Sequence, residues 1–168
     1  KRSAHFKIEF PKNIKSHLII DAFFKNSSIK VLKDESKIIG IAKNSSGGTP
    51  GNFSNYFIIE FNTPFDEFGT WDGEGNIYSS NELSGEHVGS YVSFLNNNSN
   101  VIEARVSSSF ISHDQAQINL NREIPKLQSF EKTKELAKES WNNELSRIKI
   151  KPAIKDNFSN KKDYFAAH

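Results

Sequence analysis

The residues best suited to chemistry in this sequence are its 5 histidines and 20 carboxylates, but their spacing forms no familiar catalytic motif. No two histidines have the H-x-x-x-H spacing that puts two imidazoles on one helix face, and H-E-x-x-H does not occur. The nucleophile elbow G-x-S-x-G is also absent. The lack of cysteine excludes a thiol nucleophile and a cysteine-based zinc site. Glycoside hydrolysis needs two carboxylates about 5 to 10 Å apart, and sequence spacing singles out no such pair.

Three short segments could still contact a ligand. Trp71 could present an aromatic face to a sugar, since sugar C–H groups pack on the ring while hydroxyls bond at its edge. We take Trp71 as the candidate substrate-binding residue, with a place in the hydrophobic core as the alternative. Residues 72–76 alternate acidic oxygens as a calcium loop does, but the segment is too short and a structural turn is favoured. Glu86 and His87 could reach a site or form a solvated pair.

The elements that would position these segments are β-strands, which we predict over the first two-thirds of the chain. Apolar and polar residues alternate there, as in Phe6, Ile8 and Phe10, and this period is typical of half-buried strands. The predicted strands are residues 4–10, 17–24, 28–32, 37–42, 56–61, 65–71, 91–95 and 101–110. We expect a long loop over 79–89 and a hairpin connection over 96–100. Short strands separated by turns predict an antiparallel β-sandwich.

The last third of the chain is predicted to be helical. Ser112 and Gln115 have the spacing of a capping box, which predicts a helix over 113–123. Ser129 can cap a second helix, in which an apolar stripe recurs every three or four residues up to Ile148. Trp141 lies on that stripe, and we expect it to be buried against the sandwich or against a following domain. The predicted division is a sandwich module (1–111), a helical linker (112–150) and the start of a truncated domain (151–168).

Composition excludes several classes of protein. With 168 residues, 36% hydrophobic and 25% charged, the chain has the size and polarity of one globular domain. No apolar run approaches the roughly 18 residues of a membrane helix. The 22 basic and 20 acidic residues are interspersed, so we expect neither a nucleic acid nor a membrane as a partner. There is no methionine, even at position 1, so we expect the chain to be part of a longer protein.

Several sequence patterns resemble one known family. Residues 107–123 combine S-F-x-S with A-x-x-N-L-x-x-E, and 137–148 read A-x-x-x-W-N-x-x-L-S-x-I. Residues 57–71 read F-x-x-E-F-x-x-P-F-x-x-x-G-x-W, and 89–94 read G-x-Y-V-x-F. Together these resemble glycoside hydrolase family 92, the exo-acting α-mannosidases. The resemblance covers most of the chain and loosely extends to 164–168.

The resemblance implies a fold and an activity for a parent protein. In that family a β-sandwich is joined by a helical linker to an (α/α)6-barrel, which carries the catalytic acid, the catalytic base and the calcium ligands. It therefore implies a bacterial, periplasmic or secreted enzyme that hydrolyses terminal α-mannosides of glycans with inversion and depends on calcium. This chain would be the non-catalytic part that packs on and supports the barrel, inactive alone, with no catalytic or metal-binding residue and no bound cofactor. Its partners would be its own downstream catalytic domain and mannose-containing glycans.

The alternative is a stand-alone carbohydrate-binding or adhesive β-sandwich. The composition fits both hypotheses. The W-N-x-x-L-S-x-I helix favours the first, since a free-standing sandwich has no need of a long amphipathic helix after its last strand.

Overall fold

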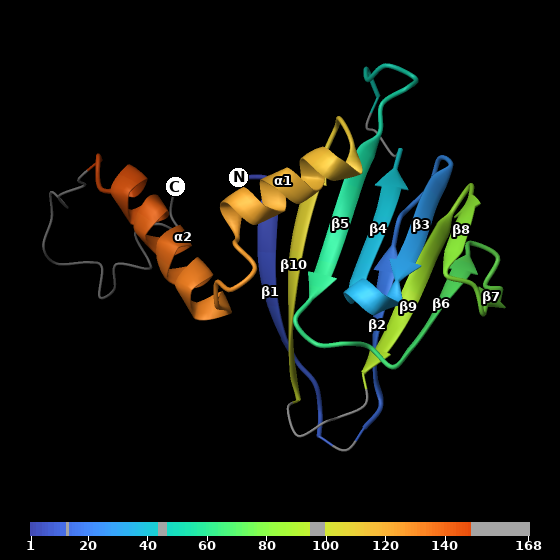
Figure 1. Cartoon of the computed structure of the whole chain (residues 1–168). Helices are drawn as coiled ribbons and strands as arrows, with labels where there is room; N and C mark the ends of the chain where they lie inside the picture. The colour runs from blue at the N-terminus through green and yellow to red at the C-terminus, as the bar shows by residue number, and fades with distance from the viewer. Residues whose placement is uncertain (13, 44–46, 95–99, 149–168) are drawn as a thin grey trace, which may run out of the picture. The chain divides into compact units, whose positions relative to one another are not determined.

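The computed structural model describes residues 1–12, 14–43, 47–94 and 100–148 (Figure 1). Within these ranges ten strands form two antiparallel sheets, and two α-helices follow. The strands are β1 (Ser3–Glu9), β2 (Ser16–Asp21), β3 (Ser27–Leu32), β4 (Lys37–Ala42), β5 (Asn55–Phe61), β6 (Glu67–Asp72), β7 (Ile77–Tyr78), β8 (Glu82–Gly85), β9 (Val88–Phe94) and β10 (Val101–Ser109). The helices are α1 (His113–Glu123) and α2 (Phe130–Leu145), and a 3-10 turn, η1 (Lys33–Glu35), joins β3 to β4.

The two sheets form the predicted antiparallel sandwich. One sheet has six strands in the order β1-β10-β5-β4-β3-β8, and the other has four in the order β2-β9-β6-β7. Alternation along each strand sends one set of side chains into the space between the sheets. The core there is built from buried aliphatic and phenylalanine side chains, among them Ile29, Ile38, Phe61, Phe65, Val92, Phe94 and Ile102. The fold class predicted from the alternating pattern is confirmed.

A second, smaller core lies on the outer face of the six-stranded sheet. Figure 1 shows α1 lying across β10 and β5, and these elements are in contact. Ala116, Leu120 and Ile124 are fully or almost fully buried against Ile58. Their spacing of four places them on one helix face, as expected for an amphipathic helix that covers a sheet. The Ser112 hydroxyl accepts a hydrogen bond from the Gln115 N–H at 3.1 Å, so the predicted cap and helix are confirmed.

The structure corrects three of the strand predictions. The predicted loop 79–89 contains β8 and the start of β9, while the two-residue strand β7 was not predicted. The predicted hairpin of 91–95 with 101–110 is wrong, because β9 pairs with β2 and β6, whereas β10 pairs with β1 and β5 in the other sheet. Alternation shows which residues face the core but does not specify the sheet to which a strand belongs. Most of the connection, 95–99, lies outside the described residues.

The chain divides into two compact units, Lys1–Thr133 and Lys134–His168. The second helix begins in the first unit, where the Ser129 hydroxyl accepts a hydrogen bond from the Lys132 N–H at 3.3 Å, as its predicted capping role requires. In the second unit Trp141 is 67% exposed, and Leu145 and Ile148 are also exposed. The predicted domain start at 151–168 lies outside the described residues.

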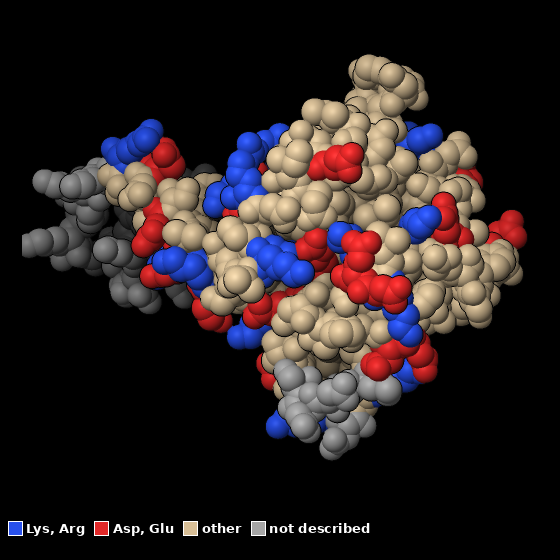
Figure 2. Space-filling model, in the orientation of Figure 1, with Lys and Arg blue, Asp and Glu red and all other residues tan. Residues whose placement is uncertain are grey.

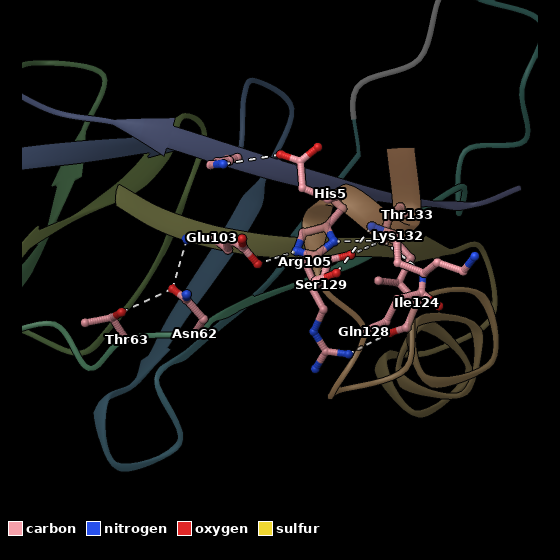
Figure 3. Close-up of polar contacts among 12 residues, drawn as sticks. His5, Asn62, Thr63, Glu103, Arg105, Ile124, Gln128, Ser129, Lys132 and Thr133 are labelled. Atoms are coloured by element: carbon pink, nitrogen blue, oxygen red, sulfur yellow. Dashed lines mark hydrogen bonds and ion pairs between the residues drawn. The ribbon is translucent and has the colours of Figure 1, made fainter. Parts of the chain in front are cut away.

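A buried histidine fastens the first turn of α2 to the sandwich (Figure 3). The His5 Nδ1 atom lies 3.0 Å from the Thr133 hydroxyl, and Nε2 lies 3.3 Å from a Glu103 carboxylate oxygen. The Phe130 ring meets the imidazole edge-on, with centroids 5.6 Å apart. Burial lowers the pKa of His5 below its ordinary value; the Glu103 carboxylate opposes this shift and Arg105 adds to it. The imidazole thus connects β1, β10 and α2.

The charges on one face of the molecule are mixed in sign. Figure 2 shows lysine and arginine side chains interspersed with aspartate and glutamate over the described residues of the face in view. Such mixing differs from the continuous basic face typical of proteins that bind a phosphate backbone. Among the described residues, no helix combines the length and apolar composition needed to cross a membrane.

Candidate functional site

Trp71 lies on the outer face of the four-stranded sheet, outside the core. Its register partner is Gly89, and the indole ring lies over this glycine: a Cβ there would come within 2.2 Å of the Trp71 Cζ2 atom. The indole N–H donates to the Ser90 carbonyl at 3.3 Å. The side chain is half-buried. Trp71 is therefore held against the sheet by its glycine partner while part of the ring remains open to solvent.

A second aromatic ring lies on the same face in the same way. Tyr91 is the register partner of Gly69, and a Cβ on Gly69 would come within 2.6 Å of the Tyr91 ring. Ile19 pairs with Tyr91 across β2 and β9, and it is 69% exposed. Two glycines thus permit two aromatic rings to lie against the strands, which leaves a partly apolar surface on this side of the sandwich.

His87 joins Trp71 to a loop that follows β2. Its ring meets Trp71 edge-on, with centroids 5.4 Å apart, and lies 4.2 Å from the ring centroid of Phe24. The His87 Nε2 atom is 2.9 Å from Asp21 Oδ1, and the same oxygen accepts the Phe23 N–H at 2.7 Å. Asp21 therefore orients both the imidazole and the loop that carries the two phenylalanines.

That loop has an unusual backbone. Phe23, Lys25 and Asn26 all have positive φ, at 68°, 70° and 62°. Positive φ is costly for residues with a Cβ, so surrounding contacts must hold the loop in place. The Ser27 hydroxyl donates to the Phe23 carbonyl at 2.5 Å, and the Asn26 N–H donates to the Glu86 carbonyl at 3.2 Å. The result is that Phe23 and Phe24 remain 45% and 48% exposed.

The turn at 72–76 is organised by one carboxylate. Asp72 Oδ1 accepts the N–H groups of Glu74 and Asn76, each at 3.0 Å, and Oδ2 accepts the Tyr78 hydroxyl at 2.5 Å. Hydrogen bonds from Tyr78 and Asn76 lower the pKa of Asp72 to about 2. The favoured interpretation of this segment as a structural turn agrees with this geometry, because the carboxylate oxygens are occupied by donors from the turn itself and from Tyr78.

These segments surround an open groove of about 540 Å³. One wall is the 72–76 turn with Tyr78, and the other is the segment 83–88. Phe24 and His87 contribute to the lining. The groove and the Trp71 face are adjacent, because His87 belongs to the groove and contacts the Trp71 ring.

The structure brings together all three segments that the sequence singled out. Trp71, the 72–76 turn and His87 meet at one end of β6 and β9, where Asp72 pairs with Val88. Sequence analysis missed Asp21, Phe24 and Tyr91. Phe24 was assigned to a continuous strand, whereas β2 ends at Asp21. The available signal was the run Phe23-Phe24-Lys25-Asn26, in which two aromatic residues precede a residue type that tolerates left-handed backbone.

The described residues do not fit a calcium ion. Calcium takes six to eight oxygen ligands, and no group of three or more His, Asp or Glu side chains converges within the described ranges. The most calcium-like segment, 72–76, uses Asp72 for its own hydrogen bonds.

The fold and site define a class: a β-sandwich with an aromatic surface, joined to a helical segment. The family model "Glycosyl hydrolase family 92 N-terminal domain" matches residues 1–109, and "Glycosyl hydrolase family 92 catalytic domain" matches residues 115–166. The chain belongs to glycosyl hydrolase family 92, as its sequence patterns predicted.

Solved structures of the same family are similar. A family GH92 inverting mannosidase from Bacteroides thetaiotaomicron VPI-5482 is 31% identical with a TM-score of 0.83, and the match covers 91% of this chain and 21% of that one. A GH92 family glycosyl hydrolase named ccman5 matches at 21% identity and TM-score 0.79, over 90% of this chain and 20% of that one. A GH92 α-mannosidase from Bacteroides thetaiotaomicron is 19% identical with a TM-score of 0.75, and the match covers 90% of this chain and 22% of that one. This chain thus spans about a fifth of these relatives. The comparison with curated proteins gave no match.

Proposed function

We propose that this chain is the non-catalytic β-sandwich part of an exo-α-mannosidase, which hydrolyses terminal α-mannosides of glycans with inversion. The observation that carries the proposal is the 31% identity with an inverting mannosidase over 91% of this chain. The adjacent matches to an N-terminal and a catalytic domain model support the same conclusion. They also favour an enzyme module over the alternative of a stand-alone binding sandwich.

In this proposal the bond-breaking groups belong to the catalytic domain. An inverting glycosidase uses one carboxylic acid to protonate the leaving oxygen and one carboxylate to activate water on the opposite face of the sugar. Calcium, bound outside this chain, would supply a hard cation for sugar oxygens. The sandwich packs on and supports that domain, and its Trp71 ring contacts the glycan. We also propose that the parent enzyme is bacterial and is either periplasmic or secreted.

The parts of this chain that serve such an enzyme are the linker contacts and the aromatic face. The buried face of α1 and the His5–Thr133 contact hold the start of the helical segment on the six-stranded sheet. Trp71 is presented on the four-stranded sheet, where its partly open ring can pack on sugar C–H groups. The sandwich therefore acts by positioning, and residues 1–168 alone should release no mannose.

The test is the anomeric outcome of the reaction. The proposed parent enzyme is incubated with methyl α-mannoside or an α-mannobiose in D₂O, and the first product is followed by proton NMR. Appearance of β-mannose before mutarotation supports the proposal, with loss of activity in EDTA and recovery on adding calcium. Initial formation of α-mannose contradicts inversion, and no release from any α-mannoside contradicts the activity. Mannose release by residues 1–168 would contradict the non-catalytic role.

A further inference from the structure

The groove between the 72–76 turn and segment 83–88 has a composition suited to one class of ligand. Phe24 and Tyr78 line it and are 48% and 38% exposed, so aromatic surface is available inside the groove. Exposed aromatic rings beside polar groups are typical of sites that bind sugars, whose C–H groups pack on the ring. The volume of about 540 Å³ lies within the range of small-molecule sites.

The charge of the groove excludes anionic ligands. Asp72, Glu74 and Glu86 line it, while none of the described lining residues is Lys or Arg. Glu74 and Glu86 are exposed, so their carboxylates can accept hydrogen bonds from hydroxyl groups. An anionic sugar or a phosphate would be repelled by these carboxylates, whereas a neutral sugar supplies hydroxyl donors to them.

Contacts within the protein also preorganise the walls of the groove. Asp72 fixes one wall through hydrogen bonds with Glu74, Asn76 and Tyr78. On the other side the left-handed backbone at Phe23, Lys25 and Asn26 keeps the Phe24 ring in contact with His87. Backbone strain of this kind persists where surrounding contacts enforce it, and it is frequent at ligand clamps. A preorganised wall reduces the entropy lost when a ligand binds.

We propose that this groove binds a neutral oligosaccharide, with Phe24 and Tyr78 packing on sugar rings and Glu74 and Glu86 accepting hydroxyl hydrogen bonds. The choice of a mannose-containing chain as ligand rests on the proposed function. The groove itself is inferred from its lining, its charge and its fixed walls.

The test is an NMR titration of the chain of residues 1–168. α-Mannotetraose is added to isotope-labelled protein, and amide shifts are followed for wild type, Phe24→Ala and Glu86→Gln. Phe6→Ala is the matched control, because Phe6 is 50% exposed on β1, outside the groove. Tetragalacturonate serves as the anionic probe.

We expect shifts within 72–78 and 83–88, a Kd at least tenfold higher in Phe24→Ala, a smaller increase in Glu86→Gln, and no change in Phe6→Ala. Tetragalacturonate should bind at least tenfold more weakly than α-mannotetraose. Absence of shifts in the groove, an unchanged Kd in both groove variants, or equal binding of the anionic probe would overturn the inference. If the parent enzyme still hydrolyses α-mannosides in that case, only the groove proposal fails. Groove binding without hydrolysis by the parent would instead reject the proposed function alone.

Discussion

The two outer faces of the sandwich differ in what covers them. The outer face of the six-stranded sheet is packed by α1 and by the first turn of α2, through Leu120, Ile124 and the buried His5. The outer face of the four-stranded sheet keeps Trp71 partly open, and Ile19 is 69% exposed there. The same strand alternation produces both faces. Within the described residues, α1 and the first turn of α2 pack on the outer face of the six-stranded sheet.

The charged side chains also differ between the covered face and the groove, being buried and paired in one and exposed in the other. Beneath α1, Arg105 is 7% exposed, donates to the Ile124 carbonyl at 2.6 Å and pairs with Glu60, so the end of the helix is tied to the sheet. Glu74 and Glu86, in contrast, are exposed beside the groove that is lined by Tyr78 of β7 and by the edge strand β8. Buried polar groups that satisfy one another fix structure, whereas exposed ones remain available to a ligand. The comparison supports the proposal that the covered face positions the helical segment and that the aromatic surface and the groove bind a ligand.

The largest effect should come from the covered face. Leu120→Ala removes a fully buried side chain from the small core and should lower the free energy of unfolding by about 2 to 5 kcal/mol. Leu127 is 99% exposed, so Leu127→Ala is the matched control and should stay within about 0.5 kcal/mol. Urea denaturation of both variants checks this, and equal stability would show that α1 is not anchored as described.

A slightly smaller loss is expected from the ion pair under the helix. Arg105→Met removes the nearest cation from Glu60, which is largely buried and among the described residues keeps only Lys37 at 3.7 Å and the Gln117 amide, and should cost about 3 kcal/mol. Adding Glu60→Gln should restore part of the stability, since the weakly compensated charge is removed. Thermal melts of the single and double variants measure this, and a double variant less stable than Arg105→Met would contradict the explanation.

On the open face, Gly89→Ala tests whether the absence of a side chain at position 89 allows the Trp71 ring to lie against the sheet. The new Cβ would lie 2.2 Å from the indole and 2.4 Å from the Ile20 carbonyl oxygen, so ring and backbone must move. Overpacking of this kind costs about 1 to 3 kcal/mol. In a Trp141→Phe background, Trp71 emission should shift to longer wavelength. Gly51→Ala is the control, because a Cβ added at Gly51 would meet nothing within 4 Å; an unshifted spectrum in Gly89→Ala would show that the ring is not held there.

The smallest effect concerns His5 and pH. Its folded-state pKa lies below the unfolded value of about 6.5, so folding favours the neutral imidazole. Stability should therefore fall as pH drops below about 6.5, until the folded-state imidazole is also protonated. His5→Gln lacks this titration, so wild type should lose stability relative to the variant between pH 7 and pH 5. Parallel pH profiles would contradict a buried neutral histidine.

Local chemistry predicted much of this molecule from the sequence. The spacing of Ser112 and Gln115 predicted the start of α1, and the alternation of apolar and polar residues predicted the strand β1, because both signals act over a few residues. Alternation did not predict burial along β1, since Phe6 is 50% exposed and the His5 side chain is buried. The sheet to which β10 belongs was not predictable, since pairing with β1 and β5 depends on distant segments. The groove was missed for the same reason. Phe24, Tyr78 and His87 are separated in sequence, and left-handed backbone at Phe23 turns the chain out of the strand.

The most direct test of the account is a kinetic comparison in the proposed parent enzyme. Trp71→Ala and the control Phe6→Ala are assayed with an α-mannooligosaccharide, and KM and kcat are determined separately. The account predicts that Trp71→Ala raises KM about tenfold, the equivalent of about 1.4 kcal/mol of lost stacking, while Phe6→Ala leaves both constants unchanged. Equal KM values for wild type and Trp71→Ala would show that the open face does not contact the glycan and would contradict the division of roles between the two faces.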